Sequence, residues 1–141
     1  MLVDELLIVW GGTSFTNGAA SINNDNRLFL LNIATHEWIV PRKYMGPPPC
    51  ARTGHASCIC GNKLIVFGGF DEKYEMNLND LRSLDLSHLR QNYVKWEQIR
   101  PAPGSRSPPG RTAHTMVAYE NKLYMFGGHG MKGCRNDTCV L

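Results

Sequence analysis

The sequence predicts an all-β fold built from successive repeats, each of which contributes short antiparallel strands. The first observation is an apolar run that ends in two glycines and occurs three times, at spacings of 57 and 59 residues, in segments 7–12, 64–69 and 123–128. The second is that other landmarks recur in the same phase: Arg52 and His55 with Arg111 and His114, and Trp38 with Trp96. Self-similarity at a near-constant period indicates a repeat architecture.

Each repeat is expected to hold four strands. The first is predicted at 55–60 and again at 114–119, and the second at 64–67, where an unbroken apolar run indicates burial on both faces of a sheet. The third is predicted at 81–86 and 28–33, and the fourth at 94–99 and 37–40. Tight polar connections at 61–63 and 120–122 favour hairpins between the first and second strands. An insertion near Ser87 is predicted to form one helical turn.

The double glycine, the downstream strand that contains aspartate and the tryptophan together resemble Kelch repeats. This resemblance covers essentially the whole chain, and it implies a β-propeller in which every repeat forms one blade of four antiparallel strands. Two departures are visible: Asn32 stands where the next repeat has Asp85, and the spacing of nearly 60 residues exceeds the usual Kelch period of about 50.

The repeat phase also divides the chain. Residues 52–99 are expected to form a complete blade, residues 1–40 and 111–141 two incomplete ones, and the Pro-rich segments 41–51 and 100–110 the connectors between them. An incomplete ring of this kind would expose strand edges, and a closed propeller has roughly 4–8 blades. We therefore expect the remaining blades to come from a longer chain or from self-assembly.

The residues that recur once per repeat are predicted to be structural. The glycines would permit close backbone packing, the histidines and arginines would tie loops to strands, and the tryptophans would pack between blades. This set comprises Gly11, Gly12, Trp38, Arg52, His55, Gly68, Gly69, Asp80, Trp96, Arg111, His114, Gly127, Gly128 and Asp137.

No catalytic, cofactor or metal residue is predicted. Segment 128–133 spells G-x-G-x-x-G, but a nucleotide-binding fingerprint needs a helix next, and the repeat places a strand there. Nothing here resembles the Tyr–Cys and copper site of galactose oxidase or the iron motif of nitrile-specifier proteins. The alternative is therefore a fragment of a galactose-oxidase-like or other metal-dependent propeller enzyme whose active site lies in missing blades.

The predicted function is a non-catalytic module that binds protein partners through one rim of long loops. Long loops on a rigid scaffold commonly carry binding, and Tyr, Arg and Met are enriched at protein interfaces. Solvated polar loops are the competing interpretation for each of them. The candidate partner-binding residues are Arg42, Tyr44, Met45, Phe70, Asp71, Glu72, Tyr74, Arg106 and His129.

Composition adds weaker expectations. A hydrophobic content of 43% and a charged content of 19% are typical of a globular chain rather than a disordered one. A net charge of +3 forces neither a nucleic-acid nor a membrane partner, and neither is expected. Five cysteines, an odd number, favour reduced thiols. We expect a cytoplasmic protein, with the nucleus as the second choice; an extracellular carbohydrate-binding propeller is a weaker alternative.

Overall fold

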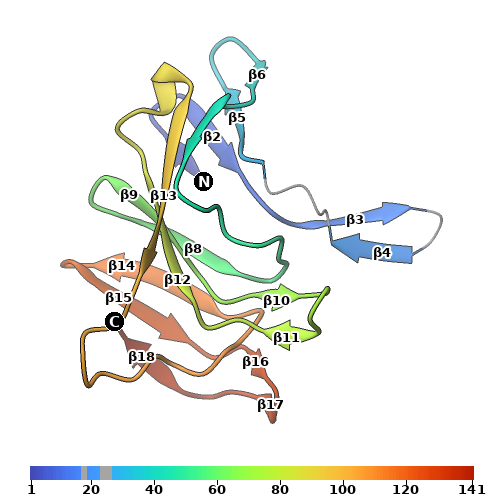
Figure 1. Cartoon of the computed structure of the whole chain (residues 1–141), viewed down its shortest axis with the longest axis vertical. Helices are drawn as coiled ribbons and strands as arrows, with labels where there is room; N and C mark the ends of the chain where they lie inside the picture. Colours follow the sequence, from blue (N-terminus) through green and yellow to red (C-terminus); the bar gives the residue numbers. More distant parts are fainter. Residues whose placement is uncertain (17–18, 23–26) are drawn as a thin grey trace.

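The structure is a computed structural model that describes residues 1–16, 19–22 and 27–141. The described residues form β-strands, turns and one short 3₁₀-helix, with no α-helix among them. The predicted all-β class is therefore confirmed. Three principal sheets follow one another along the chain, and the central sheet lies between the first and the third (Figure 1).

The central blade contains five strands rather than the predicted four. Its sheet has the order β7-β13-β12-β9-β8. The strands are β8 (Ala56–Cys60), β9 (Lys63–Phe67), β12 (Leu81–Asp85), β13 (Tyr93–Ile99) and β7 (Lys43–Met45). β7 pairs parallel with β13 and comes from the segment predicted to be only a connector. An extended Lys-Tyr-Met segment can pair with the free outer edge of β13, and this explains the extra strand.

The sheets of the two flanking blades have fewer strands than the central sheet. The first sheet has the order β1-β2-β5-β6 and the third the order β14-β15-β18. Their strands are β1 (Leu2–Val3), β2 (Leu6–Val9), β5 (Phe29–Asn32), β6 (Glu37–Ile39), β14 (Thr115–Tyr119), β15 (Lys122–Phe126) and β18 (Thr138–Val140). All pairings within these two sheets are antiparallel.

Each connection between the second and third strands folds into a small two-stranded hairpin. The pairs are β3 (Thr13–Thr16) with β4 (Ala19–Ile22), β10 (Phe70–Asp71) with β11 (Met76–Asn77), and β16 (His129–Gly130) with β17 (Gly133–Cys134). In Figure 1 all three hairpins project from the same side of the molecule. The loops that the sequence predicts at these positions are thus partly ordered by backbone pairing.

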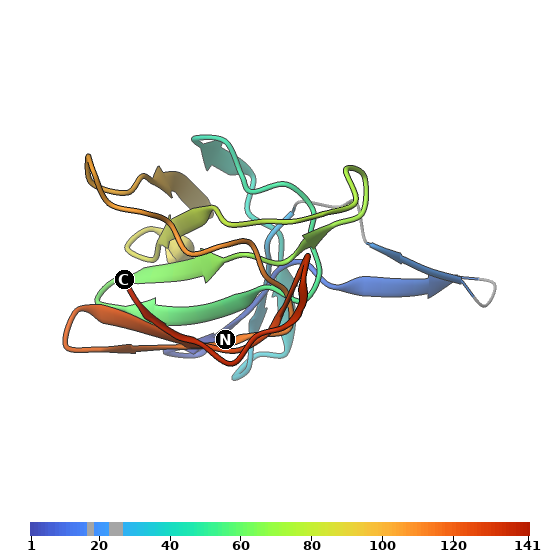
Figure 2. The same ribbon diagram turned by 90° about the horizontal axis from the view of Figure 1, so that it is seen from below.

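The core lies between the blades. β9 illustrates why: Leu64 and Val66 pack toward the first blade, whereas Ile65 packs toward the third, and all three are at most 4% exposed. Because alternate residues of a strand point to opposite faces, only a sheet covered on both sides buries such a run. Figure 2 shows hairpin β8–β9 lying over hairpin β14–β15, at the interface between the second and third blades.

The insertion after β12 forms the 3₁₀-helix η1 (Leu89–Gln91). It begins two residues after Ser87, so the expected helical turn is present. Leu89 is 3% exposed and joins the cluster between the first and second blades. Asn92, which follows the helix, has φ 62°, a left-handed conformation that asparagine tolerates better than most residues.

Candidate protein-interaction surface

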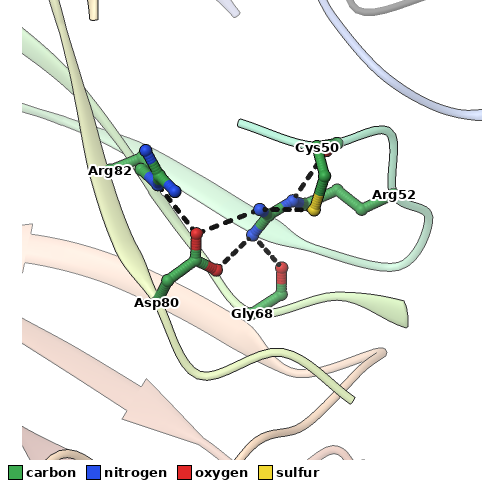
Figure 3. Close-up of polar contacts among 5 residues, drawn as sticks. All are labelled: Cys50, Arg52, Gly68, Asp80 and Arg82. Carbon is green, nitrogen blue, oxygen red and sulfur yellow. Dashed lines mark hydrogen bonds and ion pairs between the residues drawn. The ribbon is translucent and has the colours of Figure 1, made fainter. Parts of the chain in front are cut away.

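A buried arginine anchors the start of the central blade. Arg52 is 0% exposed and donates hydrogen bonds to both carboxylate oxygens of Asp80, at 2.6 and 3.0 Å (Figure 3). It also donates to the carbonyl oxygens of Gly68 at 3.0 Å and Cys50 at 3.1 Å. A planar guanidinium suits this bidentate contact. The side chain therefore joins the entering connector to the Gly-Gly turn and to the segment before β12.

The charge of Asp80 is held by two arginines. Burial alone would raise the pKa of Asp80, but the hydrogen bonds from Arg52 and Arg82 lower it below its ordinary value. Arg82 Nε lies 2.8 Å from the same carboxylate. The aspartate thus stays ionised in a partly desolvated position.

The third blade repeats this arrangement. Arg111 is 0% exposed and donates to Asp137 at 2.9 and 2.8 Å and to the carbonyl oxygen of Gly127 at 3.0 Å. The hydrogen bond from Arg111 lowers the pKa of Asp137 to about 2. We call each buried arginine with its aspartate an arginine clamp: Arg52 with Asp80, and Arg111 with Asp137. Each clamp fixes both ends of the loop that carries a small hairpin, β10–β11 in one blade and β16–β17 in the next.

The double glycines allow each blade to pack closely against the next one. Gly68 has φ 65°, and a Cβ there would lie 2.6 Å from the carbonyl oxygen of Arg111, closer than any side chain could fit. The N–H of Gly69 donates to that same carbonyl oxygen at 2.9 Å. One blade earlier, the N–H of Gly12 points to the carbonyl oxygen of Arg52 at 3.5 Å, and a Cβ on Gly11 would meet the His55 ring at 2.8 Å.

The two recurring histidines lie in the same junctions. The His55 ring centroid is 5.0 Å from that of Trp10, and the His114 ring makes an edge contact with Phe67 at 5.7 Å. Burial, reinforced by the neighbouring arginine, lowers the pKa of each histidine to about 4. Both are therefore neutral packing groups at physiological pH and contact the preceding blade.

The two tryptophans that recur in the repeat, Trp38 and Trp96, differ in exposure. Trp96 on β13 is 1% exposed and lies 5.6 Å from the Trp10 ring, so it packs between blades. Trp38 on β6 is 59% exposed. β6 is an edge strand of the first sheet, and nothing in the described part of the chain covers its outer side.

The tips of the second and third hairpins carry strongly exposed side chains. We call the tips of β10–β11 and β16–β17 the rim surface, defined by residues 72–76 and 131–134. Tyr74 is 64% exposed, Met76 48% and Met131 92%. The ammonium of Lys73 lies 5.1 Å from the Tyr74 ring centroid. This surface combines aromatic, thioether and charged groups on a fixed base.

Family comparison gives this scaffold its place. The family described as the KLHDC2/KLHL20/DRC7 Kelch-repeats domain matches residues 1–141. The chain belongs to the Kelch-repeat family.

Curated relatives agree with that membership. This Kelch chain is 40% identical to Kelch repeat-containing protein 2 of Saccharomyces cerevisiae, over 93% of the chain and 15% of that protein. It is 30% identical to human Kelch domain-containing protein 3 (91% of the chain, 30% of that protein) and 36% identical to the bovine Rab9 effector protein with kelch motifs (79% and 28%). The chain thus spans less than a third of each of these relatives.

Two of the predicted binding residues on the first rim hairpin of the Kelch blade are structural. Asp71 is 4% exposed and accepts hydrogen bonds from the backbone N–H groups of Lys73 at 3.0 Å and Tyr74 at 3.3 Å, so it closes the turn instead of facing a partner. Phe70 is half-buried, and its backbone exchanges hydrogen bonds with Thr53. Short Asx turns of this kind are common in loops, and the sequence alone does not distinguish them from exposed acids.

The predicted loop at Arg42, Tyr44 and Met45 is instead strand β7 with the residue before it. Tyr44 is half-buried, and its hydroxyl accepts a hydrogen bond from the backbone N–H of Leu28 at 3.4 Å. Met45 is 52% exposed, and Arg42 is also exposed. The backbone N–H of Arg42 donates a hydrogen bond to Oδ1 of Asn92 at 3.2 Å. These residues form the outer edge of a blade, so they are not part of the rim surface.

The remaining predicted residues are exposed. Glu72 lies within the rim surface, Arg106 lies in connector 100–110, and His129 begins β16. Prediction missed Met131, although a methionine at the tip of a glycine-flanked polar loop was a usable signal. In the G-x-G-x-x-G segment, residues 129–134 form a hairpin, and strand β18 follows it.

Among the described residues, no three His, Cys, Asp or Glu side chains converge as a metal ligand set. The same residues include no helix of the length and apolar character that a membrane span requires.

Proposed function

We propose that this Kelch chain is a non-catalytic protein-interaction module whose rim surface contacts a protein partner. The observation that carries the proposal is the pairing of exposed Tyr74, Met76 and Met131 with bases that are fixed by buried arginine clamps. Rigid anchors lose little entropy on binding, and Tyr and Met are enriched at protein interfaces. A relative named as a Rab9 effector supports a protein partner.

The neighbouring bases of the two hairpins support their use as one surface. The N–H of Ala113 donates to the carbonyl oxygen of Gly54 at 2.8 Å, and the N–H of Thr112 donates to the carbonyl oxygen of His129 at 2.9 Å. The first of these bonds connects the second blade to the third, and the second ties β16 to the start of the third blade. A partner that spans both tips would meet a surface that is already ordered.

A site-specific photocrosslinker placed at Tyr74 tests the proposal. The matched control is Tyr119, which is 63% exposed against 64% for Tyr74 but lies on β14, outside the rim surface. We expect crosslinking at position 74 to capture a discrete protein in the source cells, and position 119 not to capture it. The captured protein is then purified for binding measurements.

Affinity for that protein gives the decisive measurement. Tyr74→Ala should weaken it by at least about tenfold, as expected for an aromatic anchor, whereas Tyr119→Ala should leave it unchanged. Replacing only exposed side chains matters, because exchanging the whole of segments 70–76 or 41–49 would remove Asp71 or β7 and disturb the scaffold. Equal effects of the two variants would contradict the proposal.

A further inference from the structure

The connector between β13 and β14 contains the only serine or threonine of the sequence that is directly followed by proline. This residue is Ser107, before Pro108. The structure describes the whole connector, and no helix or strand forms in it between Ile99 and Thr115. In Figure 1 it runs as an open loop from the end of β13 to β14. The rim surface does not include this segment, so an inference about it goes beyond the proposed function.

The two serines of this connector differ in how their hydroxyl groups are used. Ser105 donates from Oγ to the carbonyl oxygen of Ala102 at 2.7 Å, and its N–H donates to the same oxygen at 3.0 Å. The Ser105 hydroxyl therefore helps to close a turn. Ser107 is exposed, and neither its hydroxyl nor its N–H has a hydrogen-bond partner among the residues that the structure describes. Its hydroxyl is thus available to react.

The internal repeat shows that this exposure is a property of the connector. At the repeat spacing of 59 residues, Ser107 corresponds to Pro48 and Pro108 corresponds to Pro49. In the central blade, where the sheet has five strands, Pro48 is exposed and Pro49 is buried. Ser107 and Pro108 have the same pattern. Position 107 therefore faces solvent for the same reason in both connectors: the proline after it anchors the chain and the residue before that proline points outward.

An enzyme that modifies Ser107 must also reach the residues on either side of it. Residues 101–107 are all exposed, whereas Pro108 is buried and must lift away to be contacted. Within the described structure, no backbone hydrogen bond involves residues 106–108, and the next one along the chain joins the N–H of Arg111 to the carbonyl oxygen of Leu78 at 3.2 Å. Because no backbone hydrogen bond has to break, lifting this short segment is a low-cost local opening.

The charge of the connector suits a phosphate group. Segment 100–110 contains two arginines, Arg100 and Arg106, and no aspartate or glutamate. Both arginines are exposed, and neither has an ion pair among the residues described. A phosphoserine carries a charge of about −1.5 to −2 at neutral pH. The two guanidinium groups therefore offset the charge that phosphorylation would add.

We propose that Ser107 is a phosphorylation site for a protein kinase that accepts proline directly after the serine. Proline favours an extended conformation of the residue before it and has no N–H to leave unpaired, so the enzyme would read an extended chain and the proline ring. Oγ of Ser107 forms a bond to the γ-phosphorus of ATP, and the bond from that phosphorus to the ADP oxygen breaks. The hydroxyl proton passes to the catalytic aspartate of the kinase.

Phosphate transfer from radiolabelled ATP with Mg²⁺, catalysed by a purified cyclin-dependent kinase, tests the proposal on the folded 141-residue chain. Mass spectrometry locates the phosphate. We expect incorporation at Ser107, and Ser107→Ala should lose it. Ser105→Ala is the matched control: it removes an exposed serine two residues away in the same connector and should keep the incorporation. Circular dichroism verifies that both variants are folded.

A synthetic peptide of residues 101–112 separates the motif from the fold. The kinase should modify this peptide, and Pro108→Ala in the peptide should abolish the reaction without any question of protein folding. Modification of the peptide but not of the folded chain would show that the fold hides the serine. Undiminished incorporation into Ser107→Ala would show that another residue is the acceptor. Either result would overturn the proposal, and so would a lack of transfer to both substrates.

Discussion

The blade junctions should lose stability between neutral pH and pH 5 because two histidines, the partly buried His55 and the buried His114, are held there in their neutral form. Each has a pKa of about 4 in the folded chain against an ordinary value of 6.5. The unfolded chain therefore binds more protons between these values, and stability falls as the pH decreases. The contribution is complete above pH 6.5 and is lost on going down toward pH 4.

The magnitude follows from the shift. One pKa unit corresponds to about 1.4 kcal/mol, so at pH 5, which is 1.5 units below the ordinary value, each histidine costs about 2 kcal/mol. The aspartates in the arginine clamps do not contribute in this window, because their ordinary pKa of 3.8 is lowered further. The contribution of the clamps is lost only below about pH 4.

Urea denaturation followed by far-ultraviolet circular dichroism, at several pH values between 5 and 7.5, measures the effect. The variant His55→Gln/His114→Gln should be less stable at pH 7.5 but should show a much shallower pH dependence than the native chain. His129→Gln, at an exposed histidine, serves as the control and should keep the native slope. Equal slopes for the double variant and the native chain would refute the assignment of the pH dependence to these junctions.

Two further outcomes are expected from the buried polar and thiol groups. Asp80→Ala should lower the free energy of unfolding by about 3 kcal/mol, because it leaves the guanidinium of Arg52 buried without its partner; Asp137→Ala should cost less in the same urea assay, since Asp137 is 41% exposed and water can replace it. Equal losses would contradict this ranking. Cys58 is buried, which raises the pKa of its thiol to about 11, so mass spectrometry should find it alkylated by iodoacetamide far more slowly than the exposed Cys134. Equal rates would show that the junction opens readily.

The sequence was informative where the chemistry recurs in every blade. The double glycines and the apolar run of β9 have few physical solutions: a positive φ with no room for a Cβ, and a strand covered on both faces. These features depend on local geometry that repeats, so the strand positions follow from spacing alone to within a residue or two. The family, the all-β class and the order of the main strands could all be predicted in this way.

The sequence was less informative where a residue's environment depends on a distant segment. Arg52 and Asp80 are 28 positions apart, and only the fold shows that they form a bidentate pair. Asp71 looks like an exposed acid until the turn that it closes is seen. Trp38 and Trp96 have the same repeat phase, yet one is exposed and the other is buried, because their surroundings are set by neighbouring blades rather than by their own strands.

By itself, the sequence determined that this protein is built from Kelch blades, because strand period, turn glycines and inter-blade packing are encoded locally and repeated. Only the tertiary structure decided which candidate side chains face solvent. Asp71 closes a turn, and Tyr44 lies in a fifth strand of the central sheet. Tyr74, Met76 and Met131 are exposed on the hairpins. The physical reason is that exposure is a property of the assembled surface: it depends on which backbone groups find partners across the blades, and spacing along one chain does not specify those partners.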